Sequence, residues 1–98
     1  MPPTFNGEIK NGQEAEAWLL EMRKYFRVQD YSRNMKARLA IFNLTGRASI
    51  WWEHHRQVKK VNKRKIVWKQ FKKYFKQKYL FDRYYDDKIK EFHELRLG

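Results

Sequence analysis

Apolar residues recur at steps of three and four along most of this chain, which is the period of an amphipathic helix. The pattern predicts five helices, over about residues 13–28, 33–44, 47–60, 65–79 and 87–97. The fourth starts at Lys65 or Val67. No alternating apolar pattern is long enough to indicate a strand. The predicted fold class is therefore all-α, a compact bundle of about five helices.

Each predicted helix has an apolar stripe that we expect to face a common core. Those of the first, second and third helices comprise Trp18, Met22, Tyr25 and Phe26; Met35, Leu39 and Phe42; and Ala48, Trp51, Trp52, His55 and Val58. Those of the fourth and fifth comprise Trp68, Phe71, Phe75 and Tyr79; and Ile89, Phe92 and Leu95. Ser32 is a good N-cap for the second helix, and Gly46 suits a left-handed cap at its end.

The first twelve residues do not fit the helical pattern. Pro2 and Pro3 disfavour a helix, and Asn6-Gly7 is a turn signal. We expect an extended N-terminal arm over residues 1–12, anchored by Phe5, and a helical core over residues 13–97. With 98 residues in all, the chain has room for a single domain.

Composition narrows the function classes. The chain is 42% hydrophobic and 17% aromatic, enough for a folded core, and it contains no cysteine, which excludes disulfides and thiolate metal sites. No apolar run approaches the ~20 residues of a membrane-spanning helix, and Pro2 excludes N-myristoylation. Adjacent His54 and His55 point about 100° apart on a helix and do not chelate together. We therefore expect no enzyme activity, metal, cofactor, small-molecule substrate or membrane association.

Charge is the strongest compositional anomaly. The formal net charge is +12, and residues 54–81 hold eleven Lys and Arg but no Asp or Glu. A field of one sign attracts polyanions such as nucleic acid. On the fourth helix, Lys65, Lys69, Lys72 and Lys76 follow helical spacing and predict a basic ridge. The candidate nucleic-acid-binding residues are Lys59, Lys60, Lys63, Arg64, Lys65, Lys69, Lys72, Lys73 and Lys76.

The order of these features resembles the Gag capsid domain of gypsy-type long-terminal-repeat retrotransposons, related to domesticated Gag-derived proteins such as Arc. The series that carries the resemblance is Phe5-x-Gly7, Trp18-Leu19, Tyr25-Phe26, Lys36, Ala40, Leu44-x-Gly46-x-Ala48, Trp51-Trp52, Trp68-x-x-Phe71, Phe75-x-x-x-Tyr79 and Phe92-x-x-Leu95. Val67 departs from the family pattern, which has a capping Thr or Ser before this tryptophan. Valine cannot accept a hydrogen bond from the helix amides.

The resemblance implies the N-terminal lobe of a two-lobed capsid protein. Similar lobes form homo-oligomeric rings that tile a shell around the element's RNA, in intracellular, cytoplasmic virus-like particles. Because exposed aromatic residues are enriched in interfaces, our candidates for the oligomer interface are Tyr31, Tyr74, Tyr84 and Tyr85. Subunits of charge +12 repel one another, so assembly should need RNA or raised salt.

Two other functions stay open at this point. One is a nucleic-acid-binding module that uses the basic segment 56–78. The other is peptide binding, which the resemblance to domesticated Gag proteins implies for a groove that involves Phe5 and Ile9. Alternatively, Phe5 and Ile9 fill that groove themselves.

Overall fold

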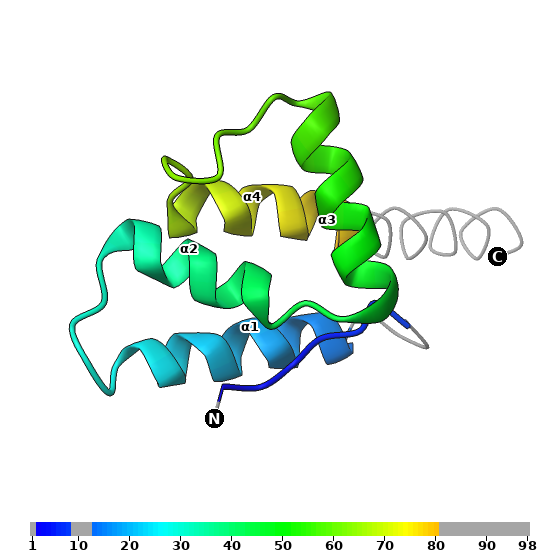
Figure 1. Cartoon of the computed structure of the whole chain (residues 1–98). Helices are drawn as coiled ribbons and strands as arrows, with labels where there is room; N and C mark the ends of the chain where they lie inside the picture. The colour runs from blue at the N-terminus through cyan, green and yellow to red at the C-terminus, as the bar shows by residue number, and fades with distance from the viewer. Residues whose placement is uncertain (1, 9–12, 81–98) are drawn as a thin grey trace, which may run out of the picture.

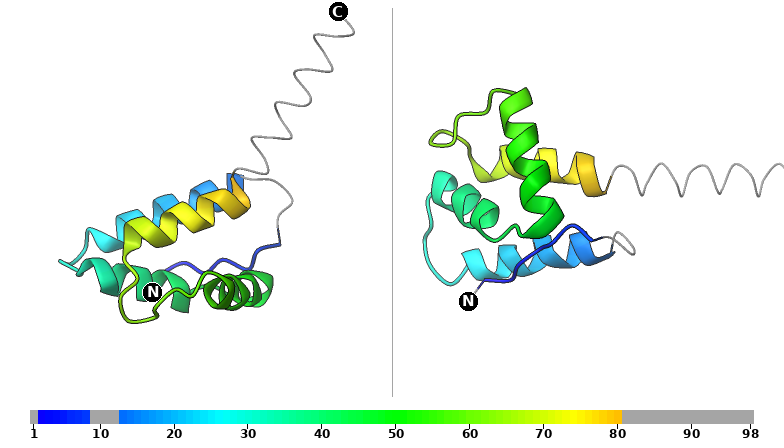
Figure 2. Two further views of the ribbon diagram at one scale, coloured as in Figure 1. Left: turned by 90° about the horizontal axis from the view of Figure 1, so that it is seen from above. Right: turned by 45° about the vertical axis from the view of Figure 1, so that its right-hand side comes forward.

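Four helices in two layers make up the part of the chain that the structure, a computed structural model, describes: residues 2–8 and 13–80. The helices are α1 (Gln13–Phe26), α2 (Arg33–Phe42), α3 (Gly46–Val58) and α4 (Trp68–Tyr79). The antiparallel helices α1 and α4 form one layer, and α2 and α3 form the other (Figures 1 and 2). The described residues contain no strand beyond one isolated bridge, so the helical class is confirmed. The predicted fifth helix lies outside the described residues.

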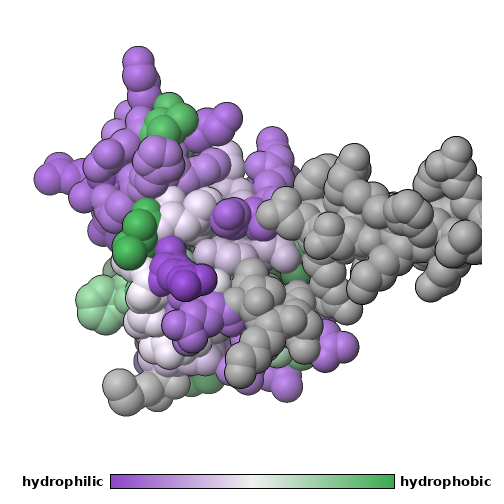
Figure 3. Space-filling model, turned by 90° about the vertical axis from the view of Figure 1, so that its right-hand side faces the viewer, coloured by the Kyte–Doolittle hydropathy of each residue, from purple (hydrophilic) through white to green (hydrophobic). Residues whose placement is uncertain are grey.

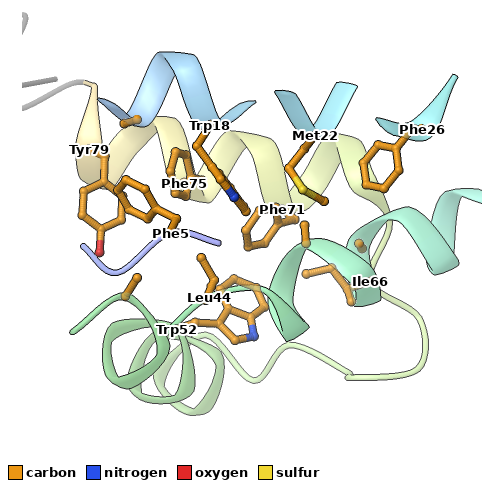
Figure 4. Close-up of a cluster of buried hydrophobic side chains, with 14 of the residues drawn as sticks. Phe5, Trp18, Met22, Phe26, Leu44, Trp52, Ile66, Phe71, Phe75 and Tyr79 are labelled. Atoms are coloured by element: carbon orange, nitrogen blue, oxygen red, sulfur yellow. The ribbon is translucent and has the colours of Figure 1, made fainter. Parts of the chain in front are cut away.

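Aromatic side chains join α1 to α4, as their apolar stripes predict. Trp18 and Phe75 have ring centroids 5.0 Å apart, and Phe26 meets Trp68 edge to face at 4.9 Å. Phe71 and Phe75 are fully buried, and each such side chain contributes roughly 1.5–3 kcal/mol. Figure 4 shows the side chains of Trp18, Phe26, Phe71 and Phe75 directed into the space between the two layers. The first helix ends at Phe26, slightly before the predicted Val28, which is exposed.

The N-terminal arm is fixed to this core by Phe5, as predicted. The Phe5 side chain is only 5% exposed, and its ring packs edge to face on those of Phe75 and Tyr79. Its backbone forms a parallel bridge with Leu44, in which the Phe5 amide donates to Asn43 and the Phe5 carbonyl accepts from the amide of Thr45. The arm is therefore a structural part of the domain.

Helix α2 contradicts the predicted inner face. Ala37 and Ala40 are fully buried, whereas Met35 is 43% exposed and Phe42 is 84% exposed. The physical reason is close packing. Among the described helices, the backbones of α2 and α4 approach each other most closely, and only small side chains fit where two helix backbones come so near. The prediction that Met35 and Phe42 face the core was wrong.

The junction between α2 and α3 also differs from the prediction. Gly46 does adopt a left-handed φ of +50°, but it is the first residue of α3 and not the cap of α2. The cap of α2 is Asn43, whose side-chain amide donates to the carbonyl of Leu39 at 2.7 Å. Helix α2 thus ends at Phe42, which frees Leu44 to pair with the arm.

Helix α3 buries Ala48 and Trp52 and half-buries Trp51 and His55, in line with its predicted stripe. The exception is Val58, which is 61% exposed at the end of the helix. The chain turns away after it, and Lys60 takes a left-handed φ of +53° that no helix can continue through.

Candidate nucleic-acid interface

The basic loop between α3 and α4 is held in one place by polar side chains. The Asn62 side chain accepts from the amide of Arg64 at 2.8 Å, and the Asn34 side chain on α2 donates to the carbonyls of Arg64 and Ile66 at 3.1 and 3.2 Å. Val61 and Ile66 are buried under the loop. Its cations are exposed: Lys59, Lys60, Lys63, Arg64 and Lys65. The loop therefore presents predicted residues on a fixed backbone.

The predicted ridge is shorter than the spacing indicated. Helix α4 begins at Trp68, so Lys65 lies in the preceding turn and is not in helical register with Lys69. The N-cap, Val67, makes no side-chain capping bond, as the departure from the family pattern predicts. On the helix itself, Lys69, Lys73 and Lys76 are exposed, while Lys72 is half-buried.

The charge of Lys72 is influenced by cations on three helices, α1, α2 and α4. The Nζ of Lys72 lies 5.7 Å from the centroid of the Trp68 ring. Burial lowers the pKa of Lys72, and so do the positive charges around it, which are those of Lys76, Arg23, Lys69 and Lys36. We call these five residues the lysine cluster. Like charges repel one another, so the cluster favours any polyanion that neutralises it.

Two members of the lysine cluster were missed from the sequence as binding residues. Arg23 belongs to α1, and Lys36 on α2 lies 5.9 Å from the centroid of the Phe26 ring. Both lie outside the acid-free stretch 54–81, and only the packing of α1 and α2 beside α4 brings them to Lys72. The sequence gives little indication of such a contact between a cation and an aromatic ring, because the two residues come together only in the folded domain.

Among the described residues, acidic side chains form few ion pairs with these cations. Within residues 2–8 and 13–80, the only salt bridge joins Arg56 to Glu53, at 3.0 Å. The Arg56 hydrogen bond also lowers the pKa of Glu53. The exposed lysines of the loop and of α4 keep their charges available to a partner.

Two of the four predicted oligomer-interface tyrosines, Tyr31 and Tyr74, are less exposed than the pattern indicated. The hydroxyl of Tyr31 donates to that of Tyr25 at 3.4 Å, and the two rings stack at 5.8 Å. This hydrogen bond, together with burial, raises the pKa of Tyr31. Tyr74 packs on His55 with ring centroids 4.5 Å apart. Both tyrosines are half-buried, and Tyr84 and Tyr85 lie outside the described residues.

Six large apolar side chains among the described residues reach the surface, and three of them, Met35, Phe42 and Val58, belong to the predicted inner stripes. The six that are prominently exposed are Leu20, Val28, Met35, Phe42, Ile50 and Val58. On the face in Figure 3, hydrophobic residues appear as separate patches within a mostly hydrophilic surface. For α2, the signal was present: Ala37 and Ala40 form a second, smaller stripe on the opposite side of the helix.

Only one of the two peptide-groove candidates, Phe5, lies among the described residues. Phe5 fills a place in the core, so a peptide at that place would have to displace it, and Ile9 lies outside the described residues. A shallow hollow of about 340 Å³ borders the arm, and Glu14 and Glu21 lie on its wall.

The two adjacent histidines of α3 lie in different surroundings. His54 is exposed, while His55 is half-buried and its Nε2 lacks a hydrogen-bond partner. In the described part of the chain, no three His, Cys, Asp or Glu side chains gather as metal ligands. Likewise, none of the four helices described is long and apolar enough to cross a membrane.

Comparison with known proteins gives one match. The model of the family described as "Retrotransposon-derived protein PEG10, N-terminal capsid-like domain" matches residues 1–80, a span that contains the arm and all four helices. No curated protein and no solved structure matches the chain significantly.

Proposed function

The chain belongs to the family of retrotransposon-derived, PEG10-type N-terminal capsid-like domains, and from this premise we propose that it self-assembles into a cytoplasmic shell around RNA. The observation that carries the proposal is the extent of the match, which includes every described element of the fold. A structural capsid role follows from the family. Particle formation and RNA enclosure are the steps that we propose beyond it.

The surface of the domain supports assembly. The aromatic residues of the core are satisfied within the two layers, so contacts between copies have to use outer faces. Ile50 is 72% exposed and Val58 is 61% exposed on α3, while Leu20 is 52% exposed on α1. Exposed apolar side chains within a polar surface are typical of interaction sites when they come together in one interface.

The charge of the domain supports a role for RNA. Copies with a net charge of +12 repel each other, and at low salt this repulsion extends over about 10 Å or more. The lysine cluster and the basic loop offer phosphate contacts that need no base recognition. RNA would therefore bind the domain and remove the main obstacle to assembly in the same step.

Assembly is tested with nuclease-treated protein at about 50 and about 200 mM salt, with and without single-stranded RNA. Light scattering and negative-stain microscopy follow the particles. We expect RNA to promote particles at low salt and raised salt to replace RNA in part. Fastest assembly at low salt without RNA would contradict the proposal.

A second candidate is RNA binding without assembly, which the lysine cluster favours. The fluorescence anisotropy of a labelled RNA measures its binding to the domain and to the variant that carries Lys69→Glu and Lys76→Glu. The matched control is Lys24→Glu and Arg27→Glu, on exposed residues at the end of α1. Loss of two phosphate contacts should reduce the slope of log affinity against log salt by about 2, and only in the α4 variant. Binding of this kind without particles would support the second candidate in place of the first.

A further inference from the structure

A groove of about 480 Å³ lies between α2, α3 and the loop that leads to α4. Trp52 and Ile66, which are 2% and 1% exposed, contribute to its lining, and Phe42 of α2 stands beside them with 84% of its surface exposed. The lining includes no residue of the described arm. The groove is therefore distinct from the peptide site that the resemblance implied near Phe5.

The loop side of the groove is preformed. The two hydrogen bonds from the Asn34 side chain hold the carbonyls of Arg64 and Ile66 against α2. The backbone amide of Ile66 also donates to the carbonyl of Asn62 at 3.1 Å, which closes the turn from within. A ligand would enter without first having to order this segment, and that reduces the entropic cost of binding.

The groove carries more positive than negative charge. Its lining includes the cations Arg38, Arg56, Lys63 and Arg64 and a single carboxylate, that of Glu53, which Arg56 already engages. The Nε of Arg56 is buried and has no hydrogen-bond partner. A buried donor left unpaired is costly, so an acceptor on a ligand would be favoured there.

From this combination we infer that the groove binds an acidic peptide segment whose apolar side chain enters between Phe42 and Trp52 while flanking carboxylates pair with the arginines. Arginine matches a carboxylate in a two-point geometry. A second copy of this chain fits poorly, because its own charge is +12. The lysines of α4 offer a polynucleotide a run of cations, whereas Ile41 and Phe42 interrupt the cations of the groove with apolar surface.

The test adds the peptide Asp-Glu-Phe-Glu-Asp to the unassembled 98-residue protein. Binding is monitored by the NMR chemical shifts of the protein's backbone amides and tryptophan indoles. We expect shifts at groove residues, including the Trp52 indole. Replacing the central Phe of the peptide by Ser should weaken binding about tenfold or more, and so should Phe42→Ser in the protein. The matched control is Val28→Ser, at a residue that is 75% exposed and does not line the groove; it should leave binding unchanged.

Charge is tested separately. Arg38→Glu and Arg64→Glu, on exposed residues, should abolish binding, whereas Lys69→Glu and Lys73→Glu on α4 change the net charge equally and should retain most of it. If both double variants lost peptide affinity equally, net charge alone would explain the binding, and the inference would be overturned. Shifts at the groove produced by oligouridylate and not by the peptide would also overturn it. Because none of these measurements reads particle formation, their outcome is independent of the proposed assembly.

Discussion

Helices α2 and α4 pack against each other but turn opposite kinds of side chain to the core. Helix α4 buries Phe71 and Phe75, and its other sides carry lysine. Helix α2 buries Ala37 and Ala40 and leaves Phe42 in solvent. The space available at a contact, and not side-chain hydrophobicity alone, therefore decides which face of a helix turns inward.

This arrangement divides the work between the two helices. The aromatic residues of α4 supply core volume, and the alanines of α2 let its backbone approach that core closely. Two large apolar residues of α2, Met35 and Phe42, are then left exposed, and Phe42 lines the groove. A helix that supplies most of the core volume can thus pack against a helix whose outer face is free to bind a partner.

The largest expected effect comes from truncating one aromatic residue on each helix. Phe71→Ala removes a fully buried ring from α4 and should lower the free energy of unfolding by about 3–5 kcal/mol. Phe42→Ala on α2 should change it by no more than about 0.5 kcal/mol, because that side chain is already exposed. Urea denaturation followed by circular dichroism measures both.

Equal losses from the two substitutions would refute the assignment of inner and outer faces. Should Phe71→Ala be unfolded without denaturant, Phe71→Leu keeps most of the buried volume and should give a smaller loss of the same sign. The loss of stability from Phe71→Leu on α4 should still exceed that from Phe42→Ala on α2.

The next effect tests the close approach of α2. Ala40→Leu adds a branched side chain at a fully buried position and should destabilise the domain by about 1–3 kcal/mol through overpacking. Arg38→Leu makes a comparable side chain at an exposed position two residues away and should have little effect on the midpoint in urea. An unchanged midpoint for Ala40→Leu would mean that space at this contact is not limiting.

How much of the fold could be predicted differs between these helices for the same reason. The stripes of α1 and α4 were predicted correctly because large apolar residues occupy one face and charged residues occupy the others. In α2, Met35 and Phe42 formed the more hydrophobic face, and hydropathy carries no information on how near another backbone will come. The family resemblance was confirmed because it depends on the order of many residues and not on a single face.

The candidate site was predicted in its local parts only. The exposed lysines of α4 follow from helical spacing, but Arg23 and Lys36 act on the charge of Lys72 from two other helices, α1 and α2. The anchoring of the basic loop by Asn34 likewise joins residues about thirty positions apart in the chain. Such contacts depend on tertiary packing, which no periodicity in the sequence encodes.

The N-terminal caps of α2 and α4 also differ, and here the expected effects on stability are smaller. Ser32 caps α2, and its hydroxyl accepts from the amide of Met35 at 3.1 Å, whereas Val67 before α4 makes no such bond. Ser32→Ala should therefore cost about 1 kcal/mol. Val67→Thr should add about 0.5–1 kcal/mol, since Val67 has the extended backbone of an N-cap and threonine keeps one of its methyl groups. Thermal unfolding detects both, and a loss of stability in Val67→Thr would show that packing of Val67 outweighs the cap.

The smallest expected effect concerns the side of α4 that faces α3, where Tyr74 covers His55. Burial lowers the pKa of His55 below its ordinary value of 6.5, and the charges of Lys59 and His54 act in the same direction. The unfolded chain then binds a proton more readily at this position than the folded domain does. The stability that neutral His55 contributes is present above about pH 6.5 and is lost as the pH falls through the lower, folded value. His55→Gln should remove this part of the pH dependence, and the same change at exposed His54 should leave it in place. If the two variants titrate alike in urea midpoints between about pH 5 and 8, then Tyr74 does not shield His55, and this side of α4 is as open to solvent as the outer face of α2.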